Sequence, residues 1–84
     1  MGSESETRRQ RIHDLEVTLW VGKGGVTAVT EELDDQLGER ELVKAKFLRA
    51  ARGADSTEDL AATLADAVDA ELLETRGNTA VFTR

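Results

Sequence analysis

Four residues between the first predicted strand and the first long predicted helix have the composition of a phosphate-binding loop. They are Gly22, Lys23, Gly24 and Gly25, called the GKGG loop below. Three glycines let the backbone turn sharply and let another backbone approach closely. The free N–H groups of the next helix point back at this loop, with the positive end of the helix dipole behind them, and Lys23 adds a full charge. The sequence therefore predicts a site for a phosphate group.

The pattern of the GKGG loop does not match the loops that bind free nucleotides. The order G-x-x-x-x-G-K-[ST] of the P-loop is absent, and the dinucleotide pattern G-x-G-x-x-G lacks its third glycine. A short clamp on a nucleic-acid backbone fits better, analogous to the GXXG loop of KH domains. The alternative is a glycine-rich turn between a strand and a helix, with an incidental surface lysine.

Other basic residues favour the nucleic-acid interpretation. Lys44 and Lys46 alternate with apolar residues in the predicted strand Leu42–Leu48, so the two lysines share one face of it. A helix predicted over Ser5–Leu15 carries three arginines. The predicted RNA-binding residues are Gly22, Lys23, Gly24, Gly25, Lys44, Lys46, Arg8, Arg9 and Arg11.

The net charge of -6 taken alone argues against a polyanionic partner, but the charges are segregated. Twelve of the 17 acidic residues lie in the stretches 24–39 and 53–75, which contain no Lys or Arg. All 11 basic residues lie elsewhere. Acids that occupy the outer faces of helices most simply provide solubility. General acid–base chemistry by a pair of carboxylates is the other interpretation, and nothing in the sequence supplies a partner base for it.

Both acidic stretches have the apolar periodicity of a helix. In the first, Thr27 is the predicted N-cap and Gly38 the predicted stop. In the second, Ser56 begins a sequence like a capping box. The predicted apolar stripes consist of Val26, Val29, Leu33 and Leu37 in the first helix and Leu60, Ala61, Leu64, Ala67 and Val68 in the second.

Strands alternate with these helices. The predicted strands are Val17–Val21, Leu42–Leu48, Ala70–Thr75 and Thr79–Thr83, the last two joined by a two-residue hairpin turn at 77–78. The predicted fold is α/β: a single domain with the order α-β-α-β-α-β-β and a small four-stranded mixed sheet. We expect residues 1–7 to form a flexible tail and residues 8–84 the domain.

The three aromatic residues and the single histidine have competing interpretations. Trp20 is a candidate for stacking on a nucleic-acid base. We expect instead that it packs under the N-terminal helix, against Ile12 or Leu15, because large aromatic side chains are usually buried. Phe47 and Phe82 are predicted core residues, and His13 is predicted to lie at a helix end rather than to bind metal. Arg49 and Arg52 either extend the lysine patch or solvate a loop.

Four segments, in order, resemble the YhbY-like, or CRM (chloroplast RNA splicing and ribosome maturation), RNA-binding domain family. They are Ile12–Leu15, Leu19–Thr27, Glu41–Phe47 and Gly77–Arg84. The resemblance covers nearly the whole chain, and it implies a fold similar to the C-terminal domain of translation initiation factor three. Stand-alone members are associated with precursors of the large ribosomal subunit, and plant members assist intron splicing.

The resemblance places the family's G-K-x-G motif on the GKGG loop and its basic second strand on Lys44 and Lys46. Two features depart from the family pattern. Members often have a proline just before the first strand, where this chain has Glu16-Val17-Thr18, and most members are clearly basic. Abundant acids with only three lysines are typical of a salt-adapted cytoplasm, so a halophilic archaeal source is one hypothesis for the acidic composition.

These observations predict an RNA-binding domain of ribosomal large-subunit assembly. The expected partner is RNA, either ribosomal RNA or a large-subunit precursor. We expect the protein to be a cytoplasmic monomer that binds no membrane, no metal ion and no cofactor. The alternative is a protein-interaction module whose sheet face or acidic helices dock on a ribosomal or other basic protein. An enzyme is not predicted, because this inventory assembles no nucleophile–base pair and no metal ligand set.

The acidic composition predicts a salt requirement. Carboxylates that repel one another at low ionic strength should destabilise the fold. We expect molar KCl to raise the midpoint of thermal unfolding substantially over its value in dilute buffer, as measured by circular dichroism. An unchanged midpoint would show that the acidic residues are not a salt adaptation.

Overall fold

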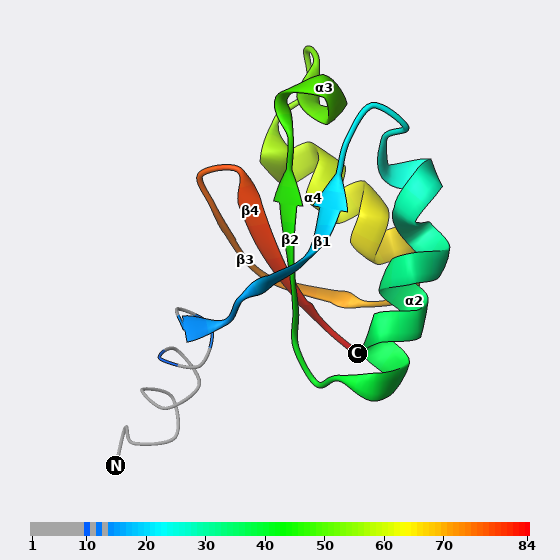
Figure 1. The fold of residues 1–84 in the computed structure, drawn as a ribbon, viewed down its shortest axis with the longest axis vertical. Helices are drawn as coiled ribbons and strands as arrows, with labels where there is room; N and C mark the ends of the chain where they lie inside the picture. The colour runs from blue at the N-terminus through cyan, green and yellow to red at the C-terminus, as the bar shows by residue number, and fades with distance from the viewer. Residues whose placement is uncertain (1–9, 11, 13) are drawn as a thin grey trace.

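The computed structural model describes residues 10, 12 and 14–84, which form one sheet with helices packed against it (Figure 1). In chain order, the elements are β1 (Val17–Val21), the 3₁₀ helix η1 (Val26–Val29), α2 (Thr30–Glu39), β2 (Val43–Phe47), α3 (Arg49–Arg52), α4 (Thr57–Ala67), β3 (Glu71–Arg76) and β4 (Thr79–Thr83).

The sheet has four strands in the order β1-β2-β4-β3. β1 pairs with β2 in parallel, through a crossover that contains η1 and α2, whereas β4 pairs antiparallel with both β2 and β3. The predicted fold class, a single α/β domain with a small mixed sheet, is therefore confirmed. The hairpin turn is also at the predicted place, with Gly77 at a φ of 59°.

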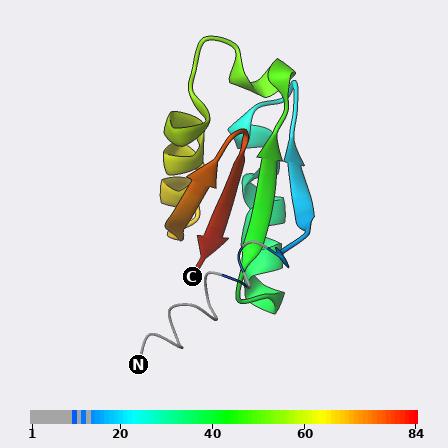
Figure 2. The same ribbon diagram turned by 90° about the vertical axis from the view of Figure 1, so that its left-hand side faces the viewer.

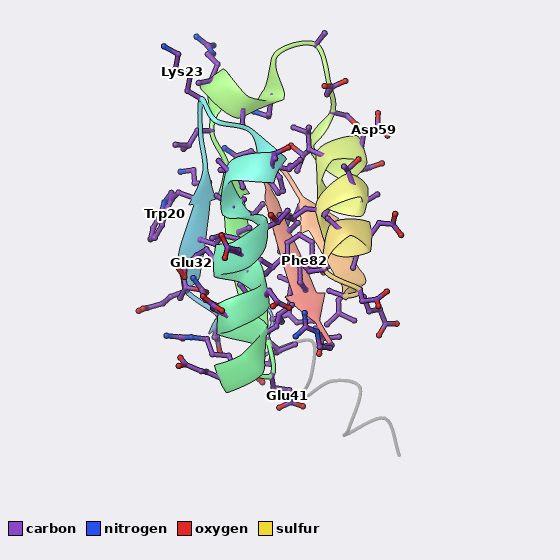
Figure 3. The ribbon with its side chains drawn as sticks, turned by 90° about the vertical axis from the view of Figure 1, so that its right-hand side faces the viewer. Trp20, Lys23, Glu32, Glu41, Asp59 and Phe82 are labelled. Carbon is purple, nitrogen blue, oxygen red and sulfur yellow. The ribbon has the colours of Figure 1, made fainter. Side chains whose placement is uncertain are left out.

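One face of the sheet packs on α2 and α4 and holds the core. Figure 3 shows these helices in front of the sheet, with Phe82 between them. Alternate residues of the strands point into this layer, and Phe47 and Phe82 are fully buried, as predicted. Each such side chain contributes about 1.5–3 kcal/mol by its burial. Leu33 and Leu37 of α2 and Leu64 of α4 complete the core on the helix side.

On the other face of the sheet, called the open face below, the described residues provide cover only at one end. There Ile12, Leu42 and Val81 form a small buried cluster, with Leu15 and Leu73 packed against it. Figure 2 looks onto this face, with the four strands side by side and α2 behind them. Among the described residues, no helix is long and apolar enough to cross a membrane.

The first acidic helix begins differently from the prediction. Thr27 is not an N-cap, because it lies inside η1, and α2 begins only at Thr30. Gly38 does not stop the helix, which continues to Glu39 and ends where Arg40 becomes extended. The apolar stripe is nevertheless correct, because Leu33 and Leu37 are buried in the core and Val26 and Val29 pack against it.

The second acidic helix begins as predicted. The Ser56 hydroxyl accepts a hydrogen bond from the backbone N–H of Asp59 at 3.1 Å, which is the N-cap interaction. In its predicted stripe, Ala67 is exposed, because α4 ends there, and Thr57 and Ala65 are buried instead. The predicted strands differ from the observed ones by only one residue at some ends.

Some predictions fall on residues that the structure does not describe. The tail over residues 1–7, the arginines Arg8, Arg9 and Arg11, and His13 all lie outside the described residues. Gln10, Ile12 and Asp14 are helical, which agrees with the predicted N-terminal helix where it can be compared.

The two faces of the sheet predict contrasting effects of aromatic substitutions. We expect Phe47→Ala to lower the free energy of unfolding by about 3–5 kcal/mol, because it leaves a cavity in the core. Trp20→Leu on the open face should change it by less than about 1 kcal/mol. Urea denaturation followed by circular dichroism measures both. Comparable losses for the two variants would contradict this assignment of faces.

Candidate nucleic-acid interface

The GKGG loop is a tight turn that only glycine can close in this form. The backbone N–H of Gly25 donates to the carbonyl oxygen of Gly22 at 2.9 Å. Gly25 has φ 72° and ψ -171°, a combination that is essentially restricted to glycine. Lys23 lies at the exposed tip, and no side chain caps the start of η1 behind the turn.

Two hydrogen bonds join β1, before this loop, to α2, after it. The Gln36 side-chain amide of α2 donates to the Thr18 carbonyl of β1 at 2.8 Å, and the Thr18 hydroxyl donates to Gln36 Oε1 at 2.6 Å. The Gln36 side chain thus provides a hydrogen-bond donor for a backbone carbonyl of β1, which is an edge strand. The loop is therefore held between a strand and a helix that are locked together.

Three connections meet at the end of the sheet that carries the GKGG loop (Figure 1). The N–H of Leu48, just after β2, donates to the Val21 carbonyl of β1 at 2.8 Å. The N–H of Phe47 donates to Asn78, in the hairpin turn, at 2.7 Å. Parallel pairing of β1 with β2 requires this arrangement, because the carboxyl ends of parallel strands lie at one edge. The GKGG loop, α3 and the hairpin turn are therefore neighbours.

A row of four residues crosses the open face next to this end. Trp20 of β1 pairs with Lys46 of β2, Lys46 pairs with Thr79 of β4, and Thr79 pairs with Arg76 of β3. Paired residues project to the same side of a sheet, so these side chains form one line, called the tryptophan row below. Its two charged members are both cations.

The next row along the open face has a different character. Val17, Lys44, Val81 and Glu74 are paired across the four strands in the same way. Lys44 therefore shares its row with a carboxylate two strands away, and its neighbour Val81 is buried in the cluster at the other end. Of the two predicted lysines, Lys46 is the one in a row without an acid, beside the GKGG loop.

The predicted packing of Trp20 is wrong. Its side chain is 55% exposed, and Figure 3 shows it pointing away from the helices, on the same side of the molecule as Lys23. Ile12 packs instead on Leu42 and Val81, with Leu15 beside them. Among the described residues, Ile12 and Leu15 therefore cover the central strands at the far end of the open face, and Trp20 is not part of their cluster.

Sequence reasoning missed one contribution to this end of the sheet and left the role of a second open. Arg76 was outside the predicted strand, which ended one residue too early; extending the alternation by one step would have placed it on the open face. The segment with Arg49 and Arg52 is the short helix α3, which follows β2 directly. Arg49 is exposed there, at the end of the sheet that carries Lys23.

The acidic residues occupy a different layer. The acids of α2 and α4 lie on the helices that cover the core face, and most of them are exposed. Arg84 lies there too, bonded to Asp34 of α2 and, at 2.8 Å, to the Val68 carbonyl after α4. Among the described residues, no group of three or more acids or histidines is arranged to hold a metal ion. The helix layer is thus negative, and the loop end of the open face is positive.

Comparison with known proteins agrees with this architecture. The model of the CRS1 / YhbY (CRM) domain matches residues 1–84. The chain belongs to this family. The resemblance carried by the glycine loop, the basic strand and the closing hairpin is therefore confirmed for the CRM domain as a whole.

Two relatives of this CRM domain are informative. One, from Methanocaldococcus jannaschii, is named "Probable RNA-binding protein MJ0652" and is 39% identical over 77 residues, which is 92% of this chain. This chain spans 58% of that relative's length. The other is a solution structure of SAV1595 from Staphylococcus aureus, described as "a putative RNA binding protein". It has a TM-score of 0.75 and 29% identity, and the match covers all of this chain and 86% of that one.

Two glycines of this CRM domain should respond oppositely to alanine. Gly25→Ala puts a Cβ on a backbone with φ 72°, so we expect it to destabilise the fold by about 1–3 kcal/mol. Gly38→Ala places a methyl group in open space within α2 and should stabilise the fold by up to about 1 kcal/mol. Thermal melts of both variants measure this, and equal effects would contradict the loop geometry.

Proposed function

We propose that this CRM domain binds structured RNA by gripping its backbone with the GKGG loop and the adjacent basic residues. The observation that carries the proposal is the placement of Lys23, Lys46 and Arg49 at one end of the sheet, away from the acidic helices. Backbone phosphates would lie against the loop, where the glycines allow close approach and Lys23 provides a full charge.

Phosphate contacts position a protein on RNA but do not read its sequence, so sequence specificity should be modest. The names of the two relatives support RNA as the partner. Ribosomal large-subunit assembly is the proposed setting, because the resemblance includes stand-alone members associated with precursors of that subunit. Arg8, Arg9 and Arg11 are proposed to extend the basic surface.

The test compares two substitutions that change the net charge equally. Lys23→Ala removes a cation from the GKGG loop, whereas Arg40→Ala removes an exposed one just before β2, at the opposite end of the sheet. We expect Lys23→Ala to weaken RNA binding about equally for all sequences and to reduce the slope of log affinity against log salt by about one. Arg40→Ala should change both quantities less.

Filter binding with total RNA at several KCl concentrations gives both quantities. Equal effects of the two variants would mean that only net charge matters and that the GKGG loop is a simple turn. No RNA retention by the parent protein at any salt would instead favour the protein-interaction module.

A further inference from the structure

We propose that an unpaired RNA base stacks on Trp20, with the phosphates that flank it held by Lys46 on one side and the GKGG loop on the other. This deepens the proposed function and rests on it. It narrows the substrate class to RNA that presents unpaired nucleotides beside its paired segments. The stacking site is the Trp20 end of the tryptophan row together with Leu48.

The first observation is the exposed apolar surface. Trp20 and Leu48 are the large hydrophobic side chains that the described residues leave exposed, at 55% and 38%. Leu48 continues the alternation of β2 on the side of Lys46, and its Cδ1 atom is 3.8 Å from the position of a Cβ built on Gly22. The apolar surface therefore extends from Trp20 toward the GKGG loop.

The second observation is the charge around this surface. The pairing partner of Trp20 is Lys46, and the row ends in the cation Arg76, with no acid among its four members. Three interstrand spacings of about 4.8 Å make this row about 14 Å long, roughly the rise of four stacked nucleotides. An aromatic platform beside a line of cations is complementary to a base with its phosphates, and this arrangement occurs in a chain of net charge -6.

The geometry favours unpaired over paired nucleotides. Within a duplex, neighbouring base pairs cover the faces of each base, so a flat aromatic side chain has no base face to contact. Loops, bulges and ends expose those faces, and proteins stack aromatic side chains on them. Because every base has such a face, this site should tolerate sequence variation, as the backbone contacts do.

The chain contains one tryptophan, so its fluorescence reports directly on this site. The unmodified protein is titrated with an RNA hairpin that has an unpaired adenosine loop and, separately, with a blunt RNA duplex of the same number of nucleotides. We expect both RNAs to bind in a filter assay and only the hairpin to quench the tryptophan emission strongly. Binding of the hairpin without a change in emission would overturn the stacking proposal while leaving the proposed function intact.

Substitutions at the same position provide the second measurement. Trp20→Leu keeps an apolar side chain without a stacking ring and should weaken hairpin binding about tenfold, with little change for the duplex. Trp20→Phe retains a ring and should keep most of the hairpin affinity. Circular dichroism melts establish that both variants are folded. Equal hairpin affinities for the parent, Trp20→Leu and Trp20→Phe would contradict stacking.

The Lys23→Ala variant separates this inference from the function on which it rests. It should weaken hairpin and duplex binding by the same factor, because it acts on the backbone alone. Loss of affinity in Lys23→Ala without loss in Trp20→Leu would support the loop clamp and reject the stacking site. Failure of the parent to bind either RNA would reject both.

Discussion

The alternation of side chains along β2 is the constraint on which the rest of the structure depends. β2 is an interior strand, so both of its hydrogen-bonding edges are paired. Val43, Ala45 and Phe47 are fully buried against the helices, and this burial fixes the register of the strand. The side chains of Lys44 and Lys46 must therefore project toward the open face. A slip of one residue would bury two lysines, so the core itself enforces the position of the basic residues.

The topology extends this constraint to the loops. Because β1 and β2 are parallel, the chain must cross back through η1 and α2, and the segments that follow each strand reach the same edge. The hairpin turn arrives there as well, through the bond between Phe47 and Asn78. Residues far apart in the sequence thus become one surface.

Periodicity and glycine punctuation were sufficient to predict the strands, the two acidic helices and the loop, because each of these is a local property of the sequence. The wrong predictions about Trp20 and about the start of α2 concern properties that depend on the tertiary structure. Whether Trp20 is covered depends on where Ile12 and Leu15 settle, and nothing in their spacing specifies this. The onset of α2 at Thr30 depends on how the chain leaves Gly25, which has a backbone conformation that no pattern of hydrophobicity encodes. The predicted third strand ended at Thr75, one residue too early, and therefore left out Arg76.

The separation of charge by layers means that ionic strength decides which part of the molecule an approaching polyanion senses. At about 0.01 M salt the Debye length is about 30 Å, and the chain acts as a body of net negative charge that repels RNA from a distance. At about 0.15 M it is about 8 Å, shorter than even the smallest extent of the molecule, 19 Å. RNA near the open face is then shielded from the carboxylates of the helix layer. Association should therefore be fastest at an intermediate ionic strength, where the repulsion is screened and the local attraction survives.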